Sequence, residues 1–171
     1  MSNKAGIKEI LVIIAPEHSG QFLNLLGSIF KNYGIQLYFE VQKVPRGLPE
    51  AFVLGEKFLD NDSVALVLGD NIFENDFSNI IKKFKSGAHV FATKVSDPER
   101  FGVVKINNLG RAIKIVEKPK NWISDLAVTG LYLYDNQVIG VAKKLKPSLR
   151  GEFEIVDLHN WYLARHELEV S

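Results

Sequence analysis

The sequence predicts an α/β fold in which a mainly parallel sheet carries helices on both faces and an antiparallel hairpin addition. Apolar, β-branched runs alternate with segments whose apolar residues recur every three or four positions, which is typical of β–α–β units. The run VALVL at 64–68 has no polar residue, as expected of a strand covered by helices on both faces of a parallel sheet. The stretch NNLG at 107–110, between two β-rich runs, indicates a hairpin.

The first part of the chain is predicted to alternate strand, helix and strand. A strand is expected at 9–14, followed by a helix at 21–33 whose apolar residues share one face. Gly34 follows this helix and is expected in a left-handed C-terminal position. The next strand is expected at 35–41. A loop then leads into a second helix, in which Pro49 occupies the first turn, where its missing N–H costs nothing.

We expect the strand at 64–68 to run through the middle of the core. Gly69 follows it and allows a tight turn, and Asp70 and Asn71 then place a carboxylate and an amide at the carboxyl end of the strand. Ligands of open α/β sheets bind at this end, and a carboxylate there could hold Mg²⁺ together with substrate phosphates. These residues are also common in turns, so a turn without a ligand explains them equally well.

The remaining predicted elements are, in order, a helix at 77–84 closed by Gly87, a strand at 89–95, a turn at 97–100, hairpin strands at 102–106 and 112–116, a strand at 127–133, helices at 136–145 and 153–165, and the first part of a strand at 168–170. The sequence contains no repeats and no low-complexity segments. We therefore expect a single domain over residues 1–171.

Composition excludes several kinds of protein. Twenty-one basic and twenty acidic residues give a net charge of +1, which argues against nucleic acid as a partner. The absence of cysteine excludes disulfides, thiolate catalysis and cysteine-containing zinc sites. No apolar run approaches the ~20 residues of a membrane span, so we expect a cytoplasmic protein without a membrane partner. The histidines lack metal-ligand spacing and are expected to be surface or hydrogen-bonded structural residues: His18, His89, His159 and His166.

Several motifs occur in order along the chain: Gln42 ahead of Gly47-Leu48, LGDN at 68–71, DPERFGVV at 97–104, EKP at 117–119 and VTGLY at 128–132. Through these motifs the sequence resembles the glucose-1-phosphate thymidylyltransferases, a family of sugar nucleotidyltransferases, over almost its whole length. The resemblance implies a Rossmann-like fold of the nucleotide-diphospho-sugar transferase type. It also implies Mg²⁺-dependent transfer of dTMP from dTTP to glucose 1-phosphate, yielding dTDP-glucose and pyrophosphate. Such a reaction requires the protein to position both substrates and to neutralise negative charge.

The resemblance also implies roles for residues on the nucleotide side. Asp70 would be the Mg²⁺ ligand and, with Lys118, one of two catalytic residues. Asn71 would touch the sugar phosphate. Gln42 would pair with the thymine edge, because a primary amide offers both donor and acceptor, and Gly47 would let the base approach the backbone. An exposed strand end is the plain alternative for Gln42.

On the sugar side, the resemblance implies that Glu117 accepts hydrogen bonds from glucose hydroxyls and that Lys118 holds the sugar's phosphate. Gly102 and Val128 would line the sugar pocket, and Tyr132 would support them. A charged strand end before a proline also explains Glu117 and Lys118. Core packing is the alternative explanation for the three residues of the sugar pocket: Gly102, Val128 and Tyr132.

The sequence departs from the family in several ways. The family's loop Gly-x-Gly-Thr-Arg-Leu, which grips the triphosphate, its following Lys-Gln pair and a downstream metal-binding Asp have no counterpart here. Phe101 stands where the family usually has Tyr, which removes one hydroxyl contact. Glu152 and Glu154 match a stretch near the family's sugar site, although an acidic pair in a first helical turn explains them adequately.

We therefore expect a chain that is truncated at both ends relative to the family and does not catalyse the reaction alone. Even one lost oxyanion donor costs roughly 3 kcal/mol, and a triphosphate cradle should cost far more. In the family the missing first strand lies inside the sheet, so a complementing N-terminal polypeptide or homo-oligomerisation is expected to cover the exposed surface. The alternative is a non-catalytic module that binds a sugar phosphate or nucleotide sugar. A receiver-like domain with Asp70 as phosphoacceptor ranks last, because it requires an acidic pair where this chain has Ala15-Pro16-Glu17.

Overall fold

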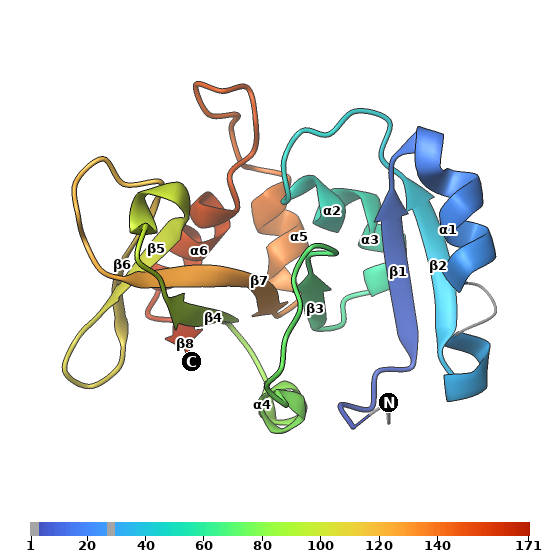
Figure 1. The fold of residues 1–171 in the computed structure, drawn as a ribbon, viewed down its shortest axis with the longest axis horizontal. Helices are drawn as coiled ribbons and strands as arrows, with labels where there is room; N and C mark the ends of the chain where they lie inside the picture. The colour runs from blue at the N-terminus through green and yellow to red at the C-terminus, as the bar shows by residue number, and fades with distance from the viewer. Residues whose placement is uncertain (1–3, 27–29) are drawn as a thin grey trace.

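Strand β7 (Leu126–Tyr134) is the centre of the larger of two sheets (Figure 1). The computed structural model describes residues 4–26 and 30–171. On one side of β7 lies β4 (Ala88–Lys94). On its other side lie β3 (Val64–Val67) and β5 (Gly102–Ile106).

Four further strands complete the two sheets. The predicted hairpin is confirmed: β5 pairs with β6 (Ala112–Glu117). At the opposite side of the sheet, β4 pairs with β8 (Leu168–Val170), the short strand expected near the end of the sequence. The smaller sheet consists of β1 (Glu9–Ile14) and β2 (Gln36–Val41), which agree closely with the first two predicted strands.

The α/β class is confirmed, but the strands do not run mainly parallel. Among the strand pairs of the described residues, β1–β2 and β4–β8 are parallel, whereas β3–β7, β4–β7, β5–β6 and β5–β7 are antiparallel. The cause is β7, which comes late in the chain and inserts antiparallel between β3 and β4, although those two strands share one direction. Apolar runs predict strands, but they do not specify which neighbour a strand takes.

The prediction that residues 64–68 run through the middle of the core, buried on both faces, is wrong in this structure. Within the described part of the chain, β3 has β7 as its only strand neighbour. Three of its residues are half-buried and Val67 is 54% exposed. The other edge of β3 faces the smaller sheet without pairing with it, so the apolar side chains lack the cover that a second neighbouring strand would give.

The helices of the first half are shorter than predicted. The expected helix at 21–33 is observed as α1 (Ser19–Leu26) and a 3₁₀ turn at Phe30–Tyr33, and residues 27–29 lie outside the described part. Gly34 follows with φ of +65°, as predicted. The next helix is divided into α2 (Glu50–Leu54) and α3 (Glu56–Leu59) at Gly55, where β1 packs so closely that an added Cβ would lie 3.1 Å from a Leu11 methyl group.

Helices cover both faces of the larger sheet, as predicted. On one face, α4 (Ser78–Lys83) packs against Leu131 and Leu133 of β7. On the other face, α2, α5 (Gln137–Ala142) and α6 (Ile155–Leu163) pack against the alternate residues Tyr132 and Tyr134. No helix in the described part of the chain is both long and apolar enough to cross a membrane.

A buried histidine under β7 departs from one prediction. His18 and His166 are exposed, and His89 contacts Ser171 and Glu169, as expected of surface or hydrogen-bonded residues. The fully buried His159 has Nε2 2.7 Å from the Tyr134 hydroxyl, but its Nδ1 has no hydrogen-bond partner among the described residues. Burial lowers the pKa of His159 from 6.5 to about 3, because the charged ring would lose its hydration.

This depressed pKa predicts a loss of stability in mild acid. Between pH 6.5 and about 3 the unfolded chain binds the His159 proton and the folded chain does not, so the free energy of unfolding falls as the pH is lowered through this window. Denaturant titrations at about pH 7 and about pH 5.5 should show wild type losing ~1 kcal/mol more than His159→Gln over this interval. The variant serves as the control for carboxylates, which titrate in both proteins. Equal losses in the two proteins would contradict the prediction.

Candidate active site

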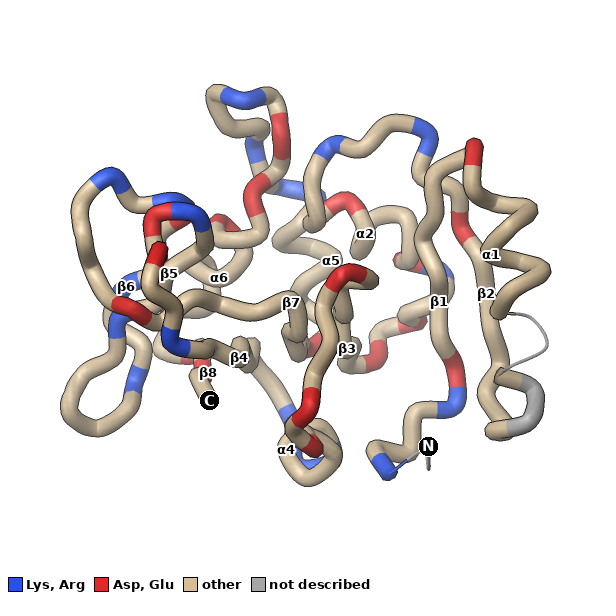
Figure 2. Tube along the Cα trace, viewed as in Figure 1, with Lys and Arg blue, Asp and Glu red and all other residues tan. Residues whose placement is uncertain are grey.

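Charged residues gather on four connections, those that follow β2, β3, α5 and β6. Figure 2 shows basic residues on the β2–α2, β6–β7 and α5–α6 connections and acidic residues along the connection from β3 to α4. Two of these loops are joined directly, because the Phe153 N–H donates to the Arg46 carbonyl at 2.8 Å. Cationic loops around a carboxylate suit a polyanionic ligand that also carries a metal ion.

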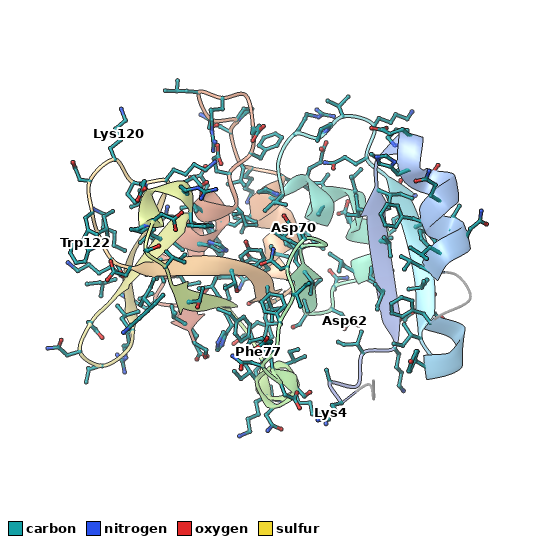
Figure 3. All side chains as sticks on the ribbon, viewed as in Figure 1. Lys4, Asp62, Asp70, Phe77, Lys120 and Trp122 are labelled. Carbon is teal, nitrogen blue, oxygen red and sulfur yellow. The ribbon has the colours of Figure 1, made fainter. Side chains whose placement is uncertain are left out.

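Asp70 stands at the tip of the loop after β3 (Figure 3). Its Oδ1 accepts a hydrogen bond of 2.8 Å from the Asn71 amide, and Asn71 Oδ1 in turn accepts one of 2.9 Å from the Gly130 N–H. The Gly130 carbonyl closes the arrangement by accepting from the Leu68 N–H at 2.8 Å. Asn71 therefore ties Asp70 to β7, and one N–H of its amide group remains for a ligand.

Gly130 was not predicted as a site residue, although the structure gives it a positioning role. A Cβ at this position would lie 2.8 Å from the Asn71 amide and 2.8 Å from the Leu68 Cβ. Only glycine therefore lets the β3 tip lie against β7. The available sequence signal was a single glycine inside a strand, which often marks a close approach of another group.

Glu117 and Lys118 lie at the end of β6. Glu117 is half-buried, and burial raises the pKa of its carboxyl, an effect that Lys118 and Arg150 oppose and Glu154 reinforces. The Lys118 ammonium is 3.9 Å from the Glu117 carboxylate. Gly102 makes room for this carboxylate, because an added Cβ would come within 3.1 Å of Glu117 Oε2.

Lys118 has φ of +42°, which is uncommon for a residue with a side chain and is often found at functional sites. Its N–H donates to the Phe101 carbonyl at 2.9 Å, which fixes this conformation. Phe101 is itself exposed, at 37%.

Arg150 joins this cluster and was missed in the sequence. Its guanidinium lies 4.0 Å from the Glu117 carboxylate and 2.9 Å from both carboxylate oxygens of Glu154. Ser148 also donates to Glu154, at 2.7 Å. These contacts give Glu154 a structural role, whereas Glu152 is exposed and contributes its backbone carbonyl to Ser148. The four-residue spacing of Arg150 and Glu154 was the signal available in the sequence.

Tyr132 of β7 is affected by both groups. The residue is 4% exposed, and its pKa is raised to about 12 by burial and by the negative charges of Glu117 and Asp70. The carboxylates at the end of β6 and at the tip of β3 therefore both act on the pKa of one buried phenol. Val128 is half-buried between two apolar clusters, which agrees with the packing alternative for this residue.

Gln42 and Gly47 occupy the β2–α2 loop. The Gln42 amide donates to Glu50 at 2.6 Å, and Arg46 pairs with the same carboxylate at 3.1 Å. Gly47 has φ of +108°, and a Cβ there would lie only 2.1 Å from the Phe153 carbonyl oxygen. The structure thus explains this glycine by the approach of another loop. Among the described residues, no hydrogen bond joins Gln42 or Gly47 to Asp70.

The acidic residues present suit a metal ion that is held mainly by its substrate. No group of three or more potential ligand side chains in the described part of the chain is arranged to hold a metal ion by itself. Asp70 offers one exposed carboxylate, oriented by Asn71. One carboxylate with substrate phosphates is a common arrangement for Mg²⁺, so this site fits that ion.

Comparison with known proteins connects this site to a family. The family model for nucleotidyl transferases matches residues 1–171. The glucose-1-phosphate thymidylyltransferase of Neisseria meningitidis serogroup A is 51% identical over 171 residues, which are 98% of this chain and 59% of that protein. The enzyme of the same name from an Actinoplanes species is 44% identical, over 97% of this chain and 55% of that protein.

Solved structures agree with these sequence relatives. A Bacillus anthracis crystal structure, described as a glucose-1-phosphate thymidylyltransferase in complex with a sucrose, has a TM-score of 0.86 and 44% identity, covering 95% of this chain and 66% of that one. A UDP-glucose pyrophosphorylase, 22% identical with a TM-score of 0.79 over 95% of this chain and 71% of that one, shares the fold. The chain spans somewhat more than half the length of the curated relatives, at 59% and 55%. By sequence and by structure, the chain belongs to the nucleotidyl transferase family.

Proposed function

We propose that this chain carries the metal ligand and the sugar-phosphate side of a glucose-1-phosphate thymidylyltransferase site. The reaction is transfer of dTMP from dTTP to glucose 1-phosphate, with release of pyrophosphate. The observation that supports this proposal is the attachment of the β3 tip to β7: Asn71, next to Asp70, accepts from the Gly130 N–H, two residues from Tyr132, and the pKa of Tyr132 is raised in part by the charges of Glu117 and Asp70. Relatives at 51% and 44% identity bear this enzyme's name. A non-catalytic binding module has no observation in its favour.

The cluster at the end of β6 is suited to a phosphorylated sugar. Glu117 is half-buried, and the nearby cations Lys118 and Arg150 oppose the rise that burial causes in its pKa. The cations therefore favour the charged carboxylate, which can accept hydrogen bonds from sugar hydroxyls. The two cations can pair with the phosphate of the same ligand. Arg150 is already held by Glu154, which orients its guanidinium before any ligand arrives.

The β3 tip and the β2–α2 loop are suited to the nucleotide. Asp70 would hold Mg²⁺, which when bound would neutralise charge on the phosphates. Asn71 fixes the orientation of Asp70. Gln42 gives one amide hydrogen to Glu50, and its remaining donor and its acceptor are suited to a pyrimidine edge.

Calorimetric titration of the purified chain tests the proposal. We expect saturable binding of glucose 1-phosphate and of dTDP-glucose, and weaker binding of fructose 6-phosphate, whose hydroxyls and phosphate are arranged differently. Pyrophosphate release from dTTP, glucose 1-phosphate and Mg²⁺ is measured on the same sample. Equal affinity for all sugar phosphates, or no binding, would contradict the proposed sugar site.

Replacing Lys118 tests the proposed phosphate contact. Lys118→Met should weaken binding of glucose 1-phosphate by about 10–100-fold, because a charge-assisted contact to phosphate is lost. The control is Lys120→Met, which removes an exposed cation from the same loop, pointing away from the body of the protein (Figure 3). Equal losses in the two variants would mean that only the overall charge of the loop matters.

A further inference from the structure

Three side chains at one edge of the larger sheet form a chain of contacts that the proposed function does not use. β8 is the edge strand and pairs in parallel with β4 (Figure 1). The Ser171 hydroxyl lies 2.8 Å from Nε2 of His89, and Nδ1 of His89 lies 3.2 Å from the Glu169 carboxylate. A hydroxyl, an imidazole and a carboxylate in this order are the arrangement that activates a serine as a nucleophile.

The sheet places these three side chains together. His89 is paired with Glu169 in the parallel register, and side chains at paired positions point to the same face of a sheet. Ser171 comes two residues after Glu169, so it lies on this face as well. Its backbone is held by β4, because its N–H donates to the Val90 carbonyl at 3.1 Å and its carbonyl accepts from the Ala92 N–H at 2.8 Å. The hydroxyl and the carboxylate therefore reach the imidazole from a fixed strand.

The imidazole is buried, whereas its two partners are exposed. His89 is 6% exposed, and its ring packs against that of Phe91, with 4.9 Å between the ring centroids. A carboxylate can only accept a hydrogen bond, so the proton of the neutral ring lies on Nδ1, towards Glu169. The lone pair of Nε2 then accepts the hydrogen bond of the Ser171 hydroxyl. His89 is therefore held in the tautomer that a general base for Ser171 requires.

The surroundings of His89 keep its ring uncharged at neutral pH. Burial lowers the pKa of His89, an effect that Glu169 opposes. The other neighbours are apolar: Leu133 is its paired residue on β7, and α4 and its flanks cover this face of the sheet with Phe77, Ile80, Ile81 and Phe84. Glu169 is thus the charged group that acts on the ring, which is free to take a proton.

We propose that Ser171, His89 and Glu169 form a nucleophilic site that takes the acyl group of a short activated carboxylic ester onto the Ser171 hydroxyl. Ser171 Oγ attacks the carbonyl carbon and forms the new C–O bond, while its proton passes to His89 Nε2. The bond to the leaving oxygen then breaks, and the alcohol departs with that electron pair and with the proton from His89. Glu169 is a positioning residue that holds the ring. None of the three residues belongs to the candidate active site, so this proposal is independent of the proposed function.

Acetylation of the purified chain by p-nitrophenyl acetate tests the proposal, with each labelled residue identified by mass spectrometry of peptides. Ser86 is the internal reference, because it is exposed like Ser171 but has no histidine partner in the described part of the chain. We expect Ser171 to be acetylated at least ~100-fold faster than Ser86, which is the lower end of what a general base contributes. Equal rates at the two serines, or no label on Ser171, would overturn the proposal.

Replacing His89 separates activation by a base from simple exposure of the serine. His89→Gln retains a side chain that can form hydrogen bonds but cannot take the proton. Acetylation of Ser171 should therefore slow at least ~100-fold, and acetylation of Ser86 should stay the same. Circular dichroism checks that the variant keeps the wild-type fold. An unchanged rate at Ser171 would mean that its exposure alone explains the label, and would overturn the proposal.

Glu169→Gln changes an exposed side chain, so it tests the same arrangement without disturbing the core. Because Glu169 raises the pKa of His89, acetylation of Ser171 should reach half of its maximal rate at a lower pH in this variant than in wild type. The maximal rate should also fall, since the ring becomes a weaker base. A merely structural role of Glu169 would leave the midpoint of the pH profile in place, and that result would overturn the role assigned to this residue.

Discussion

Replacing Asp70 with Asn should abolish the contribution of Mg²⁺ to nucleotide binding. Asp70 is exposed at the tip of the β3 loop and offers the carboxylate that would bind the ion. A carboxamide cannot supply the negative charge that Mg²⁺ prefers. We expect the Mg²⁺-dependent gain in dTTP affinity, measured by calorimetry with and without the ion, to fall by at least ~100-fold. Any pyrophosphate release should fall about 10²–10³-fold.

The fold should survive this substitution, because an Asn at position 70 can still accept the hydrogen bond from Asn71. Asp76→Asn is the matched control: it removes a carboxylate of the same connection, whose partners are Ser78 and Lys4. Asn also serves well at the start of a helix, so this control should leave stability nearly unchanged. If both variants lose the Mg²⁺ effect equally, the ion responds to the general charge of the connection and Asp70 is not its ligand.

The sequence predicted the elements of the fold better than their arrangement. The positions of β1, β2, α4 and the hairpin follow from local patterns of apolar and turn residues, which depend on neighbours in the chain. The centre of the sheet depends on long-range pairing. β7 takes this place because it pairs with three strands from earlier in the chain, and nothing within its nine residues specifies those partners.

The site was predicted unevenly for a related reason. Asp70, Asn71, Glu117 and Lys118 stand in short motifs, so resemblance alone could single them out. In the structure Asn71 bonds to Asp70 and Lys118 lies 3.9 Å from Glu117, and the charges of Asp70 and Glu117 both raise the pKa of Tyr132. Arg150 was missed because its importance lies in its approach to Glu117, which is distant in the sequence. The effect of burial on the Glu117 pKa likewise depends on packing that no local pattern reveals.

The Gly47→Ala substitution should cause the largest loss of stability among glycine substitutions on the site loops. An added Cβ would lie 2.1 Å from the Phe153 carbonyl oxygen, 2.9 Å from its nitrogen and 3.0 Å from its carbonyl carbon. All three are backbone atoms, so no rotation of a side chain can relieve the overlap. The φ of +108° adds strain for any residue with a Cβ. We expect the free energy of unfolding, measured by denaturant titration, to fall by about 2–4 kcal/mol.

Gly151→Ala separates the overlap from the backbone strain. Gly151 also has positive φ, at +78°, but no atom lies within 4 Å of the position that a Cβ would take, so only conformational strain of about 1 kcal/mol is expected. An equal fall in the free energy of unfolding in the two variants would show that the α5–α6 loop can move away at Phe153 at little energetic cost. A larger loss at Gly47 would mean that the hydrogen bond from Phe153 to Arg46 holds the two loops firmly together. Gln42 and Arg150 lie on these loops, so the same contact would then set the distance between the proposed nucleotide and sugar sides of the site.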